Sequence, residues 1–224
     1  MANVGITRCD TRLRQAITAV LDRFDRLPEQ GDGTAAAVAL PVIESGYGSG
    51  VSGMPTHPEW QAAPALLLTR RSSKLKDHPG QWALPGGRID EGETPVEAAL
   101  REMHEEVGLE LTEADVLGQL DEFVTRSGFA ILPFVVWVGD GHEPVPNPDE
   151  VDRVHRIPFT ELLRDDAPLL DETEDGDAPV LRMPVGDTWI AAPTAAFLYQ
   201  FREVCLLDKQ TRVAHFDQPR FAWK

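Results

Sequence analysis

Residues 94–108 constrain the fold most, because they combine a start signal and a stop signal for an α-helix. Thr94 is a typical N-cap residue, Pro95 suits the first helical turn, and Glu97 stands where it completes a capping box. Gly108 is a typical residue just past the end of a helix. The segment therefore predicts a helix over residues 95–107.

The predicted helix carries an apolar stripe and, beside it, a group of carboxylates. Its apolar residues recur at helical spacing and should face a core: Val96, Leu100, Met103 and Val107. Its acidic residues are Glu102, Glu105 and Glu106. Glu102 and Glu106 are i,i+4 neighbours, whose repulsion costs roughly 0.2–0.5 kcal/mol, and they lie toward the negative end of the helix dipole.

Local rules that are broken together often mark a functional site. A hard divalent cation would offset the repulsion between these carboxylates, since magnesium binds carboxylates together with water and phosphate oxygens. The alternative is a solvated acidic face that Arg101 and His104 partly neutralise. Charge spacing alone leaves both interpretations open.

Composition narrows the class of protein. The 21 basic and 37 acidic residues give a formal net charge of −16, which argues against nucleic acid or an anionic membrane as a partner. No apolar run approaches the roughly 20 residues of a membrane helix, and residues 1–10 lack the pattern of a signal peptide. Cys9 and Cys205 lie far apart and fit a reducing compartment. We expect a cytoplasmic protein.

The order of predicted elements indicates one domain over residues 1–224. Strands and helices mix without a βαβ rhythm, which favours an α+β fold with helices packed on a mixed sheet. The expected parts are an N-terminal helix within residues 1–32 whose apolar periodicity runs to Leu27, a core over about 35–205, a mobile insertion at 45–61, an acidic loop at 165–177, and a C-terminal tail at 208–224.

The run GRIDEGETPVEAALREMHEEVGL, residues 87–109, resembles the Nudix box at each of its fixed positions. That resemblance implies a Nudix fold, with a mixed sheet between helices, and hydrolysis of a nucleoside diphosphate linked to another group. It also implies Mg²⁺ or Mn²⁺ held by Glu102 and Glu106, with Glu105 as a further ligand or base. Glu93 and Arg101 would pair to brace the loop against the helix.

The preceding stretch, residues 67–87, is a basic island in an otherwise acidic chain. It resembles the signature LLTxRSxxxRxxxGxxxFPGG of coenzyme A diphosphatases, with Lys76 in place of an arginine and Leu84 in place of a phenylalanine. Lysine keeps the charge but lacks the bidentate fork of arginine. A solvated loop is the alternative. The candidate substrate-binding residues are Arg70, Arg71, Ser72, Lys76, Gly86 and Gly87.

The resemblance extends over roughly residues 35–201, and the insertion, the acidic loop and the tail lie outside it. Glu150 follows a proline-rich loop and is a candidate general base or additional metal ligand, with a surface turn carboxylate as the alternative.

The resemblance thus favours a diphosphatase that converts coenzyme A or acyl-coenzyme A to phosphopantetheine and adenosine 3′,5′-bisphosphate. Catalysis would use Glu102, Glu105 or Glu150. Two alternatives stay open, namely another Nudix substrate (ADP-ribose, a dinucleotide or a nucleoside triphosphate) and a non-catalytic nucleotide-sensing module. The expected partner is a small nucleotide, and the oligomeric state is open, a homodimer included.

Overall fold

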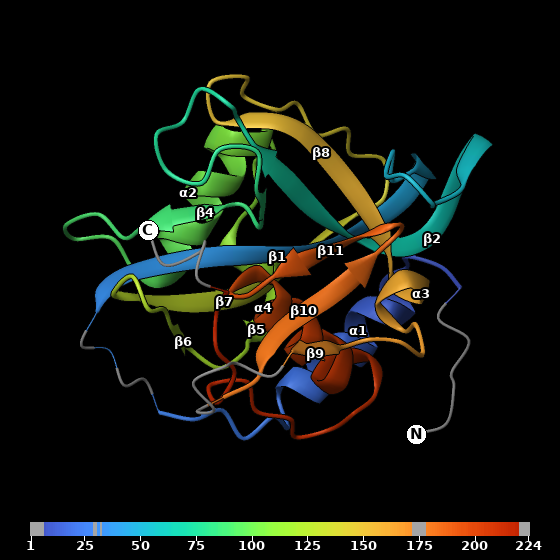
Figure 1. Ribbon diagram of the computed structural model, residues 1–224. Helices are drawn as coiled ribbons and strands as arrows, with labels where there is room; N and C mark the ends of the chain where they lie inside the picture. The colour runs from blue at the N-terminus through green and yellow to red at the C-terminus, as the bar shows by residue number, and fades with distance from the viewer. Residues whose placement is uncertain (1–6, 29–30, 32, 172–177, 220–224) are drawn as a thin grey trace.

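The computed structural model of the protein describes residues 7–28, 31, 33–171 and 178–219. Within these ranges, no helix is both long enough and apolar enough to cross a membrane. Figure 1 shows the chain traced from the N-terminus to the C-terminus.

A large mixed sheet forms the centre of the fold. Its strands are β1 (Thr34–Gly48), β2 (Thr56–Arg71), β3 (Trp82–Ala83), β4 (Gly86–Arg88), β5 (Val116–Gln119), β6 (Phe123–Val124), β7 (Phe129–Gly139) and β8 (Val151–Pro158). The main path runs β3-β2-β1-β7-β5, while β4 pairs with β1, β6 with β7, and β8 with β2. β1 and β7 are parallel and the other pairs are antiparallel. This mixture agrees with the predicted fold class.

Helices and a second, smaller sheet cover the large one. The helices are α1 (Thr11–Leu21), α2 (Pro95–Val107), α3 (Phe159–Leu162) and α4 (Thr194–Phe201), with a 3-10 turn η1 (Glu113–Asp115) and a π-helical turn η2 (Arg202–Leu206). The smaller sheet has the strand order β11-β10-β9, formed by Thr188–Ala191, Val180–Val185 and Leu169–Asp171.

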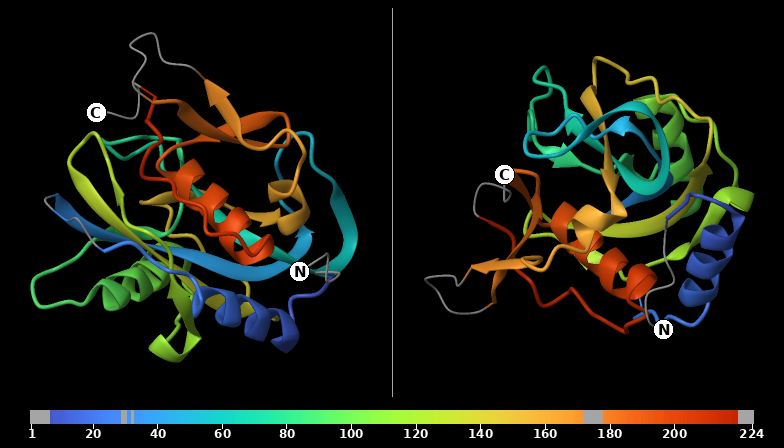
Figure 2. Two further views of the ribbon diagram at one scale, coloured as in Figure 1. Left: turned by 90° about the horizontal axis from the view of Figure 1, so that it is seen from below. Right: turned by 90° about the vertical axis from the view of Figure 1, so that its right-hand side faces the viewer.

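Each face of the large sheet has its own hydrophobic core. Alternate strand residues point to opposite faces, so Leu66 and Leu68 of β2 pack with α1 and α4, whereas Ala65 and Leu67 pack against α2. Figure 2 shows α4 and α2 on opposite sides of β1. The predicted arrangement, a sheet between helices, is confirmed, and the small sheet adds to the α4 side.

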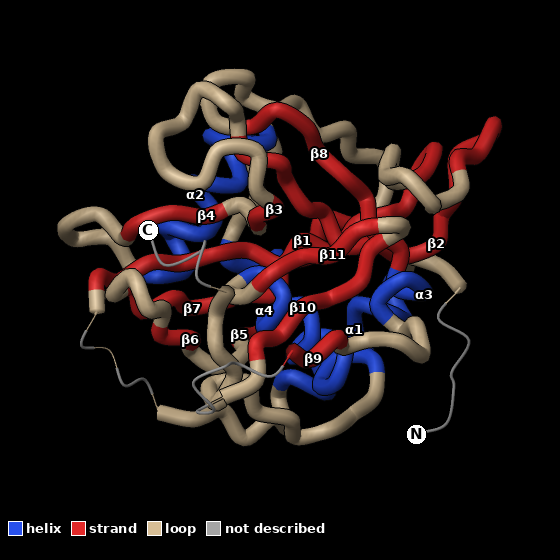
Figure 3. Tube along the Cα trace, viewed as in Figure 1, coloured by secondary structure: helices blue, strands red, loops and turns tan. Residues whose placement is uncertain are grey.

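The prediction of a mobile insertion at residues 45–61 is wrong, because most of these residues belong to strands. β1 continues to Gly48 and β2 begins at Thr56, so the two strands project together from one edge of the molecule (Figure 3). Gly46 and Gly48 have positive φ angles and coincide with register shifts between the strands. The glycines therefore allow bulges in a long hairpin rather than marking a loop.

Other boundaries also differ from the sequence pattern. The apolar periodicity predicts an N-terminal helix to Leu27, but α1 ends at Leu21 and the Leu27 N–H donates to the buried Asp121 carboxylate. A tertiary contact thus overrides the local periodicity. In the predicted acidic loop at 165–177, β9 pairs with β10, and residues 172–177 lie outside the described residues.

Candidate active site

Helix α2 supplies the acidic side chains of the site. Its predicted boundaries are confirmed, since Thr94 caps the helix in a complete capping box with Glu97 and Gly108 ends it in the left-handed conformation. Glu106 lies beside the apolar stripe, as the sequence predicts, but it is buried rather than solvated. Glu106 is 6% exposed and lies on the buried side of the helix together with Met103 and Val107.

Three carboxylates from two separate parts of the chain lie close together. Glu102 and Glu106 lie one turn apart on α2, and Glu150 lies just before β8. Carboxylate oxygens of the three residues lie within 4.8 Å of one another. The structure thus joins two glutamates of the helix to a third one that is 44 residues further along the chain than Glu106.

The end of α2 explains how Glu150 reaches this position. The last carbonyl groups of a helix need partners from outside it. The carbonyl oxygens of Glu106 and Val107 accept backbone N–H groups of Asn147 and Val145, at 2.9 and 2.8 Å. The 140–150 loop is thereby docked on the helix end, and a turn at Asn147 leads directly into Glu150.

The glycines before the helix allow the chain to approach these carboxylates closely. A backbone hydrogen bond from Gly86 reaches the Glu106 carboxylate. A β-carbon at Gly87 would overlap the carboxylate of Glu102. Gly87 thus needs to be glycine because the Glu102 carboxylate lies directly against its backbone, whereas a β-carbon at Gly86 would overlap the backbone of Ala37 and Val38 in β1.

Arg101 links the loop to the helix. Its guanidinium donates to both carboxylate oxygens of Glu93, at 2.9 and 3.2 Å, and to the backbone carbonyl of Arg88. It also donates to Glu102 and Glu105, at 2.8 and 3.0 Å. Glu105 itself is exposed and is not part of the carboxylate cluster. The site thus separates Glu105 from Glu106, its neighbour in sequence.

Burial and mutual repulsion raise the pKa values of the clustered carboxyl groups. Burial, followed by the nearby Glu102 charge, raises the pKa of Glu106 to about 8. Burial is also the largest cause of the raised pKa of Glu102, where the ion pair with Arg101 acts in the opposite direction. Arg71 favours the ionised form of Glu106 through its charge. The surroundings therefore disfavour the ionised forms of Glu102 and Glu106 when no cation is bound.

The donor set fits a hard divalent cation. Glu102, Glu106 and Glu150 offer only oxygen atoms, which magnesium and manganese prefer to nitrogen or sulfur ligands. A divalent charge would also offset the repulsion and burial that raise the carboxyl pKa values. The chemistry of these residues is thus that of a metal site able to accept phosphate oxygens.

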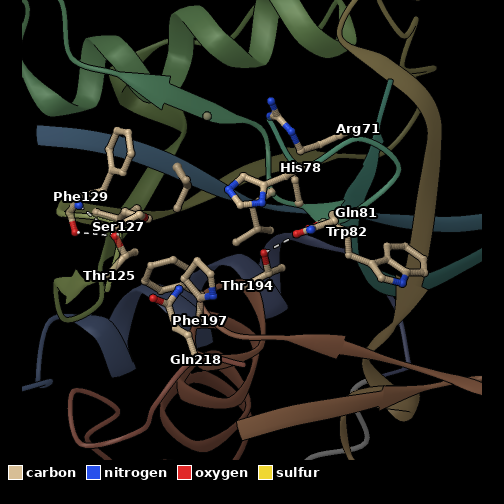
Figure 4. A pocket seen from close by; sticks show the side chains of 16 residues that line it. Arg71, His78, Gln81, Trp82, Thr125, Ser127, Phe129, Thr194, Phe197 and Gln218 are labelled. Carbon is tan, nitrogen blue, oxygen red and sulfur yellow. Dashed lines mark hydrogen bonds between the residues drawn. The ribbon is translucent and has the colours of Figure 1, made fainter. Parts of the chain in front are cut away.

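A pocket of about 210 Å³ adjoins the carboxylate cluster. It shares Gly86 and Arg71 with the surroundings of Glu106. Figure 4 shows His78 pointing into the pocket and the Trp82 indole pointing away from it. His78 has a positive φ of 54°, which a non-glycine residue rarely adopts. The pocket places room for a ligand beside the acidic cluster.

The predicted substrate-binding residues fall into different environments. Arg71 lines this pocket, whereas Arg70 lines a second pocket on the other side of Trp82. The Ser72 hydroxyl donates to the Pro148 carbonyl and its N–H donates to the Glu150 carbonyl, so Ser72 holds the loop that carries Glu150. Lys76 is exposed and does not line either pocket.

The opposite wall of the pocket is formed by residues that the sequence did not indicate as substrate-binding. That wall comes from segments far apart in the chain, namely Thr125, Ser127, Phe129, Pro193, Thr194, Phe197 and Gln218. Gln218 belongs to the segment expected to be a tail. The described part of that segment packs on the domain, because Asp217 forms a bidentate ion pair with Arg126, at 3.0 and 2.7 Å, and Val213 is buried. The polar tail sequence gives no periodic signal for this packing.

Comparison with known proteins agrees with this geometry. The model of the NUDIX domain matches residues 48–182. A Nudix hydrolase NudL of Yersinia enterocolitica is 36% identical over 156 residues, which are 67% of this chain and 72% of the relative. Nudix hydrolase 3 of Caenorhabditis elegans is 39% identical over 104 residues, 45% of this chain and 43% of that protein.

A solved structure supports the fold. The MutT/nudix family protein from Enterococcus faecalis aligns with a TM-score of 0.51 at 16% identity, over 84% of this chain and 68% of that chain. The family model covers more than half of this chain and includes the whole helix that carries Glu102 and Glu106. The chain belongs to the Nudix hydrolase family.

Proposed function

We propose that the protein hydrolyses the diphosphate of coenzyme A or an acyl-coenzyme A, giving phosphopantetheine, or its acyl form, and adenosine 3′,5′-bisphosphate. The observation that carries the proposal is the cluster of Glu102, Glu106 and Glu150 beside a pocket that includes Arg71. Diphosphate hydrolysis depends mainly on positioning and on offsetting negative charge. The cluster and the arginine supply these two functions side by side.

Each group of the site has a distinct role in this proposal. Glu102 and Glu106 would hold Mg²⁺ or Mn²⁺, which when bound would offset charge on the diphosphate oxygens and lower the pKa of bound water. Glu150 completes the cluster from outside the helix, so we assign it the removal of a proton from the attacking water. Arg71 binds the diphosphate, since its guanidinium suits phosphate oxygens. Arg101 and Glu93 hold the loop and helix in register.

The substrate assignment rests on the segment that resembles the coenzyme A diphosphatase signature. In the structure this segment forms a wall of the pocket through Arg71, His78 and Leu84. Leu84 is buried, so its replacement of phenylalanine keeps the wall apolar. Lys76 is exposed, so its replacement of arginine leaves the lining of the pocket unchanged. The two departures from the signature therefore preserve the chemistry of the pocket.

A panel of substrates tests the proposal. The purified protein with Mg²⁺ is incubated with coenzyme A, an acyl-coenzyme A, ADP-ribose, a dinucleotide and a nucleoside triphosphate, and products are separated by chromatography. We expect the highest kcat/KM with coenzyme A or its acyl form and no turnover in excess EDTA. Release of neither phosphopantetheine nor adenosine 3′,5′-bisphosphate would overturn the substrate assignment. Faster turnover of another member of the panel would replace it.

The cysteines support the cytoplasm as the proposed compartment. Cys9 and Cys205 are both buried and free. Free thiols in this state are typical of proteins in reducing compartments.

A further inference from the structure

A second pocket lies on the other side of Trp82 from the one beside the carboxylates. Its volume is about 390 Å³, and its charged lining residues are Arg70, Arg153 and Asp152. His155 also lines it, and burial lowers the pKa of this imidazole, which disfavours its cationic form. The charged lining therefore has two positive groups and one negative group, in a chain whose formal net charge is −16.

Arg70 and Arg153 form a pair of like charges directly opposite each other. They are register partners in the antiparallel ladder of β2 and β8. Directly opposite side chains share one face of a sheet with β-carbons roughly 4.5–5.5 Å apart, and like charges in that position are destabilising. The two arginines thus form an unfavourable cross-strand pair. Such a pair often marks a functional site when no structural contact compensates for the repulsion.

Neighbouring carboxylates offset this repulsion only slightly. Among the described residues, no carboxylate lies within ion-pair distance of Arg70. Arg153 meets only the adjacent Asp152, at 3.7 Å, and both side chains are exposed. Surface pairs of this kind contribute little. An anion between the two guanidinium groups would remove the repulsion.

The surroundings hold the Arg70 side chain in position. Its guanidinium lies 4.1 Å from the centre of the Trp82 ring and donates to the Gly80 carbonyl at 2.9 Å. The centre of the His155 ring lies 4.7 Å from that of the Trp82 ring, and Nδ1 of His155 is hydrogen-bonded to the Ser49 carbonyl oxygen. A guanidinium fixed by stacking loses less freedom when it binds a phosphate.

The second pocket is separated from the first one by Trp82. Trp82 lines both, and the segment from Thr188 to Thr194 runs from one to the other along β11. Arg70 and Arg71 are adjacent in β2 yet line different pockets. A ligand with two separated anionic groups can therefore meet the carboxylate cluster and Arg71 with one group and the Arg70–Arg153 pair with the other.

We propose that the pocket between Arg70 and Arg153 is a subsite for a second phosphate group of the substrate, a phosphate monoester distant from the diphosphate that is cleaved. The inference rests on the proposed function, since coenzyme A carries such a monoester on its ribose. Two guanidinium groups on one sheet face match the charge and the oxygen geometry of a phosphate monoester.

Calorimetric titration tests this subsite with ligands that differ by one phosphate. Adenosine 3′,5′-bisphosphate, adenosine 5′-monophosphate and inorganic phosphate are titrated into the Mg²⁺-loaded protein and its Arg70→Gln, Arg153→Gln and Arg12→Gln variants. Arg12 is an exposed arginine of α1. We expect the wild type to bind the bisphosphate about tenfold or more tightly than the monophosphate. This preference should shrink in both pocket variants and persist in Arg12→Gln.

Thermal melting separates a binding role from a structural one. Removal of one of two opposed like charges should leave the Tm of Arg153→Gln without ligand equal to or above that of the wild type. The rise in Tm caused by the bisphosphate should be smaller in this variant. Arg153 is largely exposed, so this variant keeps the test valid even if Arg70→Gln fails to fold.

Three results would overturn the subsite. In the first, the pocket variants prefer the bisphosphate over the monophosphate as strongly as the wild type does. In the second, the wild type shows no such preference. In the third, inorganic phosphate binds as tightly as the bisphosphate. The last result would indicate a site for free phosphate. Failure to hydrolyse coenzyme A, together with a bisphosphate preference that depends on Arg70 and Arg153, would overturn the proposed function and leave the subsite standing.

Discussion

At the scale of single residues, Glu105 and Glu106 are neighbours in sequence with opposite environments. Glu105 is exposed and paired with Arg101, whereas Glu106 is buried against Gly86 and the other clustered carboxylates. The sequence predicts that these glutamates share a function, although at about 100° per residue Glu106 lies nearer than Glu105 to the apolar stripe of the helix. The depth at which Glu106 is buried depends on how the Ala98–Ala99 side of α2 packs on the sheet.

The raised pKa of Glu106 predicts a pH-dependent affinity for metal. Below about pH 8 the Glu106 carboxyl of the metal-free protein holds a proton that must leave before a cation can bind. Affinity for Mg²⁺ or Mn²⁺ should therefore fall as the pH decreases, by at most about tenfold per pH unit. Calorimetry at several pH values between about 6 and about 8.5 measures this. Glu105→Gln, a change at the exposed neighbouring glutamate, should keep the pH dependence of metal affinity. Equal affinity of the wild type at both ends of the pH range would contradict the prediction.

A methyl group at residue 87 should disturb the site directly. The Gly87→Ala change puts a β-carbon into the space of the Glu102 carboxylate. We expect turnover to fall about tenfold or more, and the free energy of unfolding to fall by about 1–3 kcal/mol. Chemical denaturation and steady-state kinetics measure the two effects. Gly31→Ala is the control, because a β-carbon at Gly31 meets no atom within 4 Å; equal behaviour of both variants would contradict the close approach.

At the scale of elements, sequence patterns predict α2 well and the loop of Glu150 poorly. The α2 boundaries follow from local signals, namely the cap, the proline and the terminal glycine. The position of Glu150 follows from hydrogen bonds between the 140–150 loop and the carbonyl groups of Glu106 and Val107. Such non-local bonds leave no periodic pattern in the sequence. For the same reason, the bulges at Gly46 and Gly48 resemble a loop in sequence although they belong to a hairpin.

The loop that carries Glu150 should loosen when Ser72 loses its hydroxyl. The Ser72→Ala change removes the bond to the Pro148 carbonyl in a buried position. We expect a loss of about 1–2 kcal/mol in the free energy of unfolding and a severalfold weaker affinity for metal. Ser73→Ala, a change at the exposed neighbouring serine, should have neither effect. A Ser72→Ala variant with wild-type metal affinity would show that the loop is held by other contacts.

At the scale of the whole molecule, the pocket depends on chain segments that the family resemblance does not include. The segment 208–219 returns to the domain, where Asp217 pairs with Arg126 and Gln218 lines the pocket. The sheet between helices could be predicted from the sequence. The contribution of the C-terminal segment to the pocket could not be predicted from the sequence. This segment has few apolar residues, and its contacts are non-local, such as the ion pair between Arg212 and Asp121, which are 91 residues apart.

Breaking the Arg126–Asp217 pair should affect substrate binding more than chemistry. The Asp217→Ala change removes a bidentate ion pair that holds the segment containing Gln218. We expect KM for the preferred substrate to rise about three- to tenfold, with kcat changed less. Steady-state kinetics provides the measurement. Asp208→Ala, which removes a surface pair with Arg23, is the control; a KM unchanged by Asp217→Ala would show that the segment does not shape the pocket.

The central claim is that the buried carboxylate cluster, not the acidic helix surface in general, carries out metal-dependent diphosphate hydrolysis. The most direct measurement compares Mg²⁺-dependent coenzyme A hydrolysis by the wild type, Glu106→Gln and Glu105→Gln. We predict about a 100-fold or greater loss of kcat in Glu106→Gln and less than about a tenfold loss in Glu105→Gln. Near-wild-type turnover by a folded Glu106→Gln variant, or equal losses in both variants, would contradict the account.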